Sequence, residues 1–184
     1  MQKIFTTLLV CLISSSFYAQ TEVEAIPKKE AKEFEIDSTL VLTLDTTLNT
    51  LYNVISGEKE VERNWKQFKY LFKEEAKLIP SYKDEDDVYQ VRYLSPKDYI
   101  KSSGKWLVEH GFFEKEIHRD VDVFGNIAQV YSTYEAFYSE SDDKPFMRGI
   151  NSIQLLNDGA RWWIVNIYWT QETPENPIPI KYLP

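Results

Sequence analysis

The sequence is poor in cysteine and has no long apolar run. Its single cysteine, Cys11, lies within the first 19 residues, so a chain that loses this segment can form no disulfide. The apolar stretch IFTTLLVCLI is shorter than the roughly 20 residues that a transmembrane helix needs. We therefore expect the mature chain to fold by packing alone and to have no membrane span.

Basic charge is also scarce. The chain has 21 Lys and Arg residues against 29 Asp and Glu residues, which gives a net charge of −8. Removal of residues 1–19 takes away Lys3, so the mature net charge is −8 − 1 = −9. A surface this acidic repels phosphate backbones, and no basic aromatic patch offsets the repulsion. The sequence therefore argues against nucleic-acid binding.

Motifs that would identify a reaction are missing as well. The sequence has no Gly-rich phosphate loop, no nucleophile elbow and no His-Glu-x-x-His zinc spacing. We therefore predict no metal and no cofactor, and the sequence leaves the catalytic residues unknown.

The first residues have the pattern of an export signal. A positively charged start and the apolar stretch lead through SSSFYA to a cut after Ala19. A cut after Ser16 is an alternative because Phe17 is large for its position. A lipid-modified Cys11 is another, although the two residues before it are not small. We expect a periplasmic or secreted protein whose remaining 184 − 19 = 165 residues form one domain.

Composition and periodicity divide the rest of the chain. Residues 20–38 are charged, without a sustained apolar period, and indicate a flexible tether. Residues 39–172 form the domain. The tail 173–184 has four prolines and is expected to lie extended along a sheet edge or over a pocket mouth. Apolar spacing and caps predict helices over 44–55, 65–72 and 96–108, and strands over 76–82 and 88–94.

The first two predicted strands contain a proline and are joined by an acidic loop. Pro80 cannot donate to a strand ladder, so its strand is expected to be short or at a sheet edge. The loop 83–87 could be imagined as a calcium site. It lacks the spaced Asp residues, the Gly and the closing Glu of an EF-hand, so a solvated turn is favoured.

Two β-hairpins follow. The first is FFEKEIHRDVDVF, the turn Gly125-Asn126, and IAQVYSTYEAFY; the second is FMRGINSIQLL, the turn Asn157-Asp158-Gly159, and ARWWIVNIYW. Such turn residues tolerate positive φ and are typical of tight hairpins. The predicted order is α-α-β-β-α-β-β-β-β. This order indicates an α+β fold with helices on one face of an antiparallel sheet.

The chain also resembles a known superfamily. The stretch NVISGEKEVERNWKQFKYLFKEEAKLIP is similar to the first two helices and first strand of the nuclear transport factor 2-like superfamily, closest to its uncharacterised bacterial SnoaL-like branches. FGNIAQVYSTYEA and RGINSIQLLNDGARWWIVNIYW resemble its later strands, so the resemblance covers residues 39–172. It implies a cone-shaped, cystatin-like curved sheet around N-terminal helices, an apolar pocket, and often a homodimer through the outer sheet face. Relatives include isomerases, dehydratases, cyclases, carrier subunits and binding domains, so no reaction is selected.

The register of the first hairpin predicts what faces the pocket. A two-residue Gly125-Asn126 turn places Phe124 opposite Ile127. The face expected to look inward then carries Ile117, Arg119, Val121, Val123, Ala128, Val130, Ser132, Tyr134 and Ala136. The outer face carries Glu114, Glu116, His118, Asp120, Asp122, Gln129, Tyr131, Thr133 and Glu135.

Arg119 is the cation on the expected inner face. Burying it without a partner costs several kcal/mol, so it anchors an anionic group of a ligand, forms a structural ion pair with a carboxylate of the helices, or extends to solvent at the rim of the sheet. His118 could act as a base with Asp120 or Glu116 beside it, or hold a metal with these carboxylates. On the outer face a solvated or dimer-facing stripe is the favoured interpretation, although a one-residue bulge would exchange the faces.

The last hairpin supplies further candidate ligand-binding residues. A two-residue Asp158-Gly159 turn places Leu155, Ile153 and Asn151 opposite Trp162, Ile164 and Asn166, with Tyr168 beyond. Asn151 and Asn166 would then orient a ligand or satisfy each other. A three-residue loop would instead turn inward Trp163, Val165, Ile167 and Trp169.

Three functions remain. The first is an exported protein that binds a small, largely apolar ligand, neutral or anionic, through Arg119, Tyr134, Asn151, Asn166 and Tyr168. The second is a cofactor-free isomerase, cyclase or dehydratase of SnoaL type, which needs a carboxylate or imidazole in the cavity. The register places none there. The third is a structural or dimerisation module with a filled cone.

Overall fold

The computed structural model describes residues 33–184. The predicted export signal over residues 1–19 lies outside the described residues, as does most of the predicted tether, so both stay predictions. No helix within residues 33–184 is long and apolar enough to cross a membrane.

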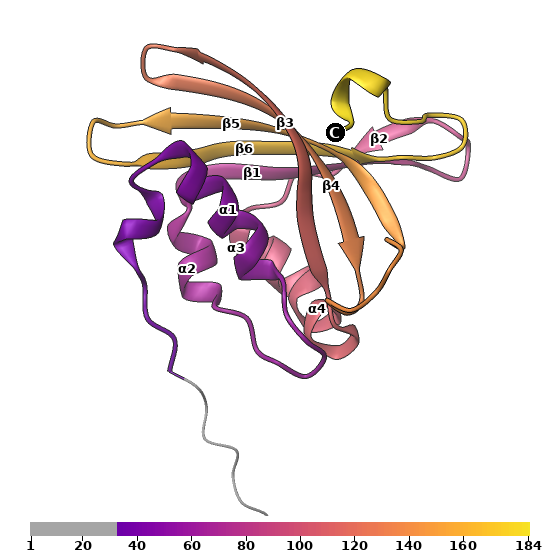
Figure 1. The fold of residues 1–184 in the computed structure, drawn as a ribbon, viewed down its shortest axis with the longest axis horizontal. Helices are drawn as coiled ribbons and strands as arrows, with labels where there is room; N and C mark the ends of the chain where they lie inside the picture. The colour runs from indigo at the N-terminus through magenta and orange to yellow at the C-terminus, as the bar shows by residue number, and fades with distance from the viewer. Residues whose placement is uncertain (1–32) are drawn as a thin grey trace, which may run out of the picture. The chain divides into compact units, whose positions relative to one another are not determined.

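Six strands form one curved sheet, and the helices cover one of its faces (Figure 1). We call this the concave face and the other the convex face. The strand order is β2-β1-β6-β5-β4-β3. The helical segments are η1 (Ser38–Val41), α1 (Leu44–Ile55), α2 (Trp65–Tyr70), α3 (Pro96–Tyr99), η2 (Ile100–Gly104), α4 (Lys105–His110) and η3 (Ile180–Tyr182). The strands are β1 (Phe72–Lys83), β2 (Tyr89–Val91), β3 (Phe113–Phe124), β4 (Ile127–Phe137), β5 (Met147–Asn157) and β6 (Trp162–Gln171).

The architecture confirms the predicted α+β class and element order. Strands β3 to β6 form the predicted antiparallel meander. Strand β1 pairs with β6 in parallel, however, so the sheet is mixed rather than wholly antiparallel. The strand that contains Pro80 is neither short nor at the edge. Pro80 lies where β1 stops pairing with β6 and begins pairing with β2 at Ser81, so its missing donor costs little.

The helices begin at capping side chains. Thr43, Asn64 and Ser95 accept hydrogen bonds from backbone N–H groups in the first turns of α1, α2 and α3. The third predicted helix is present over 96–110, but η2 is a π turn between α3 and α4. Such π turns are frequent at functional sites. Ser103 of this turn lines the cavity described below.

The buried Arg63 joins α1 to α4. It is 3% exposed, and its guanidinium donates to the carbonyl oxygens of Ile55 (3.0 Å), Gly57 (2.6 Å) and Leu107 (3.0 Å). Ile55 and Leu107 both line the cavity on the concave side. This side chain therefore holds two walls of the cavity together.

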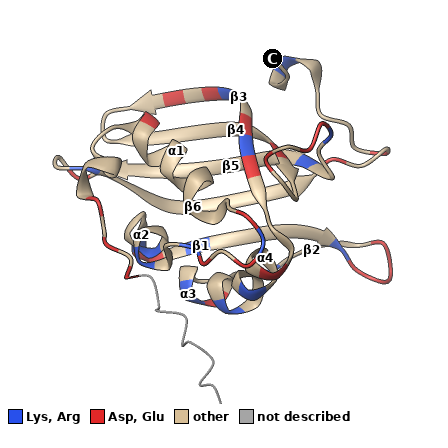
Figure 2. Cartoon of the chain, turned by 60° about the horizontal axis from the view of Figure 1, so that its bottom comes forward, with Lys and Arg blue, Asp and Glu red and all other residues tan. Residues whose placement is uncertain are grey.

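The β3–β4 hairpin has the predicted register next to its turn. The pairing is confirmed from Phe124 opposite Ile127 to His118 opposite Thr133. Over this range Arg119 faces the helices, and His118 faces the convex side. Figure 2 shows charged residues gathered along β3, whereas β6 has none.

A β-bulge at Ile117 changes the other half of β3. Beyond it the register shifts, and Glu116 lies opposite Tyr134. Because side chains alternate along a strand, the shift turns the preceding residues to the other face. Glu114 and Glu116 therefore face the helices. The prediction that the inner face has no carboxylate is wrong.

The predicted register of the last hairpin is also wrong. Its loop has four residues, 158–161, and the Asp158 carboxylate accepts hydrogen bonds from two backbone N–H groups within it. A further bulge at Val165 shifts the pairing again, so that Asn166 lies opposite Gln154. Asn166 is thus on the convex face, whereas Asn151 is on the concave face. The predicted pair of facing asparagines does not exist.

Residues next to α2 extend the folded unit before residue 39. The backbone N–H of Asp37 donates to the Gln67 side chain (2.8 Å), and the Asn64 amide donates to the carbonyl oxygen of Glu35 (2.8 Å). The last part of the predicted tether is therefore packed against the domain.

The C-terminal tail crosses the convex face. Thr133 donates through its hydroxyl to the carbonyl oxygen of Tyr182 (2.7 Å), and the rings of Tyr131 and Tyr182 stack with centroids 5.3 Å apart. Ile178 is 8% exposed. The tail thus covers part of the face through which the predicted homodimer would form, and that dimer stays a prediction.

Candidate functional site

A cavity of about 210 Å³ lies between the helices and the concave face. Trp106 lines it and is 39% exposed, so the cavity reaches the surface beside α4. Its apolar lining includes Leu51, Ile55, Phe68, Leu78, Leu107, Phe112, Met147, Ile167 and Trp169. Its polar side chains are Tyr99, Ser103, Glu114, Tyr134 and Asn151.

Glu114 is the carboxyl group of this lining. It faces inward because of the bulge at Ile117. Burial raises the pKa of Glu114 from 4.5 to about 7, and the hydrogen bond from the Asn151 amide (3.3 Å) lowers it by less. Both protonation states of this carboxyl group are therefore present near neutral pH.

Two tyrosine hydroxyl groups lie in the same lining. Neither the Tyr99 hydroxyl nor the Tyr134 hydroxyl forms a hydrogen bond with another residue in 33–184. Burial raises the pKa of both hydroxyl groups above 10, and the nearby Glu114 carboxylate raises it further. Both groups therefore stay protonated and can donate to an oxygen atom of a bound molecule.

A chain of hydrogen bonds begins at Glu114. The Asn151 amide donates to the Glu114 carboxylate and to the hydroxyl of Tyr52 (3.1 Å). The Tyr52 hydroxyl lies 2.6 Å from the Ser132 hydroxyl. Tyr52 on α1 thereby connects Asn151 of β5 to Ser132 of β4.

The same chain ends at the protein surface. Ser132 donates to Glu116, which is paired with Arg119. Arg119 Nη1 lies 2.6 Å from Asp45, whose side chain is 80% exposed. These carboxylates occupy the guanidinium, and Arg119 does not line the cavity. Its arrangement is the structural ion pair with a helix carboxylate, not the ligand anchor.

The other predicted ligand-binding residues are divided between the two faces. Tyr134 and Asn151 line the concave cavity. Tyr168 lines a groove on the convex face, and the Asn166 amide lies 3.5 Å from Gln154 on that face. The structure therefore brings together two of the five residues predicted for the pocket.

The predicted alternatives for His118 can be placed as well. His118 lies on the convex side, where its Nε2 is 3.6 Å from Asp120. The bulge precedes His118 and therefore does not turn it inward. Within residues 33–184 no three side chains of His, Cys, Asp or Glu are placed to hold a metal ion.

The sequence interpretation missed Glu114 and Tyr99 as site residues. A signal for Tyr99 was available, because Tyr99, Ser103 and Trp106 have the spacing of one helix face. No such signal exists for Glu114, whose direction depends on the bulge.

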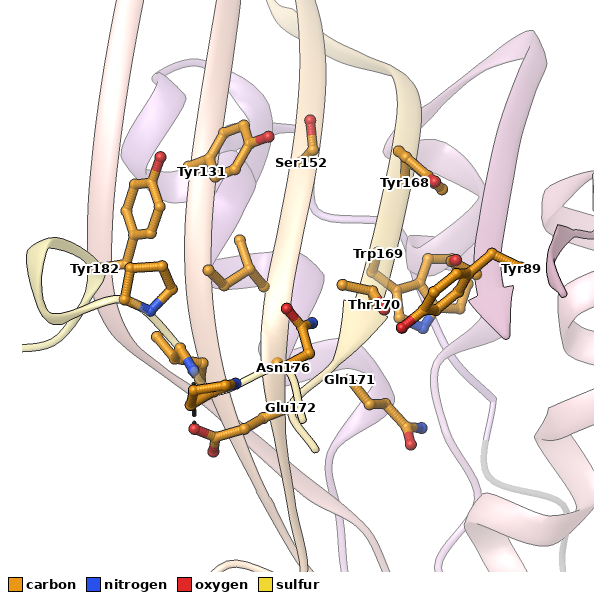
Figure 3. A pocket seen from close by; sticks show the side chains of 16 residues that line it. Tyr89, Tyr131, Ser152, Tyr168, Trp169, Thr170, Gln171, Glu172, Asn176 and Tyr182 are labelled. Atoms are coloured by element: carbon orange, nitrogen blue, oxygen red, sulfur yellow. Dashed lines mark hydrogen bonds between the residues drawn. The ribbon is translucent and has the colours of Figure 1, made fainter. Parts of the chain in front are cut away.

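The groove on the convex face is larger, about 500 Å³, and lies under the tail (Figure 3). Its single carboxylate, Glu172, accepts hydrogen bonds from the Ile178 backbone N–H (3.0 Å) and from Arg148 (2.8 Å). These contacts hold the pKa of Glu172 below its usual range. No free acid or base faces this groove among the described residues. Of these two hollows, the concave cavity is therefore the candidate site for acid–base chemistry.

Comparison with known proteins identifies the fold. No protein-family model matches the sequence, and no curated protein matches it. A protein of unknown function with a cystatin-like fold from Nostoc punctiforme has 8% identity over 77% of this chain and 97% of its own, with a TM-score of 0.54. A nuclear transport factor 2-like protein of unknown function from Silicibacter pomeroyi has 17% identity over 70% of this chain and 92% of its own, with a TM-score of 0.50.

A third structure has a name that refers to an enzyme. A scytalone dehydratase-like protein from Novosphingobium aromaticivorans has 13% identity over 71% of this chain and 82% of its own, with a TM-score of 0.52. Identities this low concern the fold and not the activity. The chain has the nuclear transport factor 2-like fold that its sequence predicts.

Proposed function

We propose that the domain binds a small, largely apolar molecule in the concave cavity and that Glu114 exchanges a proton with it, as in a cofactor-free isomerase or dehydratase. The observation that carries the proposal is a carboxyl group in an apolar cavity with a pKa raised to about 7. A general acid–base group works best when its pKa lies near the working pH. The fold shared with a scytalone dehydratase-like protein agrees with this class of reaction.

The volume and lining of the cavity limit the size and shape of the ligand. An apolar cavity of about 150 Å³ accepts benzene, so a cavity of about 210 Å³ suits a molecule with one or two small rings. The aromatic lining, which includes Phe68, Trp106 and Trp169, favours a flat ring. A hollow of this size also counts against a purely structural module with a filled cone.

The polar groups of the cavity have complementary chemistry. The ionised Glu114 takes a proton from a carbon next to a carbonyl group, and the electron pair of that C–H bond forms an enolate. Tyr99 or Tyr134 donates a hydrogen bond to the enolate oxygen, where negative charge develops. Where a C=C bond adjoins the enolate, its electrons shift and Glu114 returns the proton to the far carbon of that bond, which completes an isomerisation. In a dehydration, the enolate breaks the C–O bond of a hydroxyl group on the neighbouring carbon, and this group takes the proton from Glu114 and leaves as water.

Deuterium exchange into 2-tetralone tests the proposal without knowledge of the natural substrate. This two-ring ketone has exchangeable protons next to its carbonyl group. We expect the protein to accelerate their exchange in D₂O at neutral pD, as followed by ¹H NMR. Glu114→Gln should lose about a hundredfold of the acceleration, since a positioned acid–base group contributes at least that much.

Glu135→Gln is the matched control, because it removes a carboxylate from the convex face. This variant should keep the full acceleration. Equal exchange rates for the wild type and Glu114→Gln would contradict proton transfer by Glu114. Saturable binding of 2-tetralone without accelerated exchange would support ligand binding in the cavity but would contradict an enzymatic function.

A further inference from the structure

The groove on the convex face is built from three adjacent strands and the tail. Tyr131 of β4, Ser152 of β5 and Tyr168 of β6 lie opposite one another in the strand register. Strands are spaced by about 4.8 Å, so roughly 10 Å separates the backbones of the two tyrosines. Figure 3 shows this row, with Tyr182 of the tail beside Tyr131. The small side chain of Ser152 leaves a trough between aromatic walls.

One of these walls has a free ring. Tyr131 is stacked on Tyr182, whereas Tyr168 is 44% exposed and has no ring partner among the described residues. An exposed aromatic ring beside a hollow offers a flat apolar surface on which a ligand can pack. Tyr168 therefore has the position of a stacking platform.

Unused hydrogen-bonding groups line the same groove. The side chains of Thr170, Gln171 and Asn176 line the groove, and none of them forms a hydrogen bond with another side chain or backbone group in 33–184. An amide side chain both donates and accepts, as does a hydroxyl group. These groups match a ligand that carries several hydroxyl groups.

The lining of the groove also has no free charged group. Its one charged residue is Glu172, and Arg148 together with the Ile178 backbone already binds that carboxylate. A cation or an anion would find no free partner in the lining. The chemistry therefore selects a neutral polar ligand.

We propose that the convex groove binds a neutral saccharide. One sugar ring packs its C–H face on Tyr168, and its hydroxyl groups bond to Thr170 and Asn176. The volume of about 500 Å³ lies within the range of roughly 300 to 1,000 Å³ that is common for small-molecule sites. Tyr168, Thr170 and Asn176 do not line the concave cavity proposed for proton transfer, although Trp169 lines both.

Titration of the isotope-labelled protein with maltotriose, cellotriose and chitotriose, followed by NMR, tests this site. At least one trisaccharide should shift the backbone amide signals of residues 150–152 and 168–171 in a saturable way. Tyr168→Ala should weaken the binding about tenfold, because it removes the stacking surface. Tyr93→Ala is the matched control, since Tyr93 is 67% exposed and lies outside the groove.

Four results would overturn the proposal. The first is the absence of saturable shifts with all three trisaccharides. The second is equal affinity in Tyr168→Ala and Tyr93→Ala. The third is binding whose shifts are confined to cavity residues outside the groove, such as Tyr99, Ser103 and Glu114, which would place the sugar in the other cavity. A loss of binding in Glu114→Gln with unchanged binding in Tyr168→Ala would likewise place the sugar there and contradict the convex site.

Discussion

Two arginines, one on each face of the sheet, are each held between two carboxylates. On the concave side, Arg119 contacts Glu116 and, at 2.6 Å, Asp45 of α1. On the convex side, Arg148 contacts Glu135 at 3.6 Å and Glu172 at 2.8 Å. The same chemical unit therefore occurs twice, under the helices and under the tail.

The two ion-pair groups differ in the further hydrogen bonds that their carboxylates accept. Glu116 accepts a hydrogen bond from Ser132, and the contacts continue through Tyr52 to the cavity. Glu172 accepts one from the Ile178 backbone, and its contacts end at the tail. One group supports a buried cavity, and the other anchors a surface segment. From the sequence alone, Arg119 and Arg148 are both cations on strands. Their different roles follow from their positions in the fold.

The largest expected effect concerns the pH dependence of stability. The pKa of Glu114 is raised from 4.5 to about 7 in the folded protein, so folding favours the protonated carboxyl group. The wild type should therefore lose stability relative to Glu114→Gln as the pH rises from 4.5 to about 7, by about 3 kcal/mol in total. Urea unfolding at a series of pH values measures this difference.

The contribution of Glu172, on the convex face, to the pH dependence of stability should have the opposite sign. Its pKa is lowered by the Ile178 backbone N–H and by Arg148, so its contribution to stability is present above the pKa of the unfolded chain and is lost as the pH falls. Glu172→Gln should remove this contribution at neutral pH. If the two variants changed the pH profile in the same direction, the contrast between the faces would be refuted.

The next effect is the cost of removing each arginine. The side chains of Arg119 and Glu116 are 17% and 15% exposed, so Arg119→Met leaves a largely buried carboxylate without its partner. We expect a loss of about 2 kcal/mol in the free energy of unfolding. Arg148 is 30% exposed, and Arg148→Met should cost less than about 1 kcal/mol. Equal losses in denaturant titrations would contradict the assignment of distinct roles.

The smallest expected effect is a shift in the pH profile of exchange on substitution of Asn151, with Asn166, its expected partner, as the control. The Asn151 amide lowers the pKa of Glu114, so Asn151→Ala should raise that pKa further. The pH profile of 2-tetralone exchange should then move to higher pH. Asn166→Ala, on the convex face, is the control and should leave the profile unchanged. A shift in both variants would mean that the effect is not transmitted by the Asn151 contact.

The fold was predictable because its signals are local. Helix α1 follows from an apolar stripe, and the β3–β4 turn follows from Gly125-Asn126, where Gly125 has a φ of 58°. Tyr134 and Asn151 were found as pocket residues because no irregularity displaces them. The parallel pairing of β1 with β6 was not predicted, since nothing in either segment specifies its partner.

The candidate site was less predictable because two bulges decide it. One unpaired residue, Ile117, moves Glu114 from the outer to the inner face, and the bulge at Val165 helps to separate Asn166 from Asn151. Neither bulge is marked by a glycine or another distinctive residue. The central catalytic candidate is therefore a consequence of strand irregularity rather than of a motif.

A direct titration of the Glu114 carboxyl group is the most decisive measurement. The carboxyl ¹³C signal, assigned by its absence in Glu114→Gln, can be followed by NMR across the acidic and neutral range. A midpoint near pH 7 is the predicted result. A midpoint near the ordinary value of 4.5 would show a solvated carboxylate and would contradict proton transfer in the concave cavity.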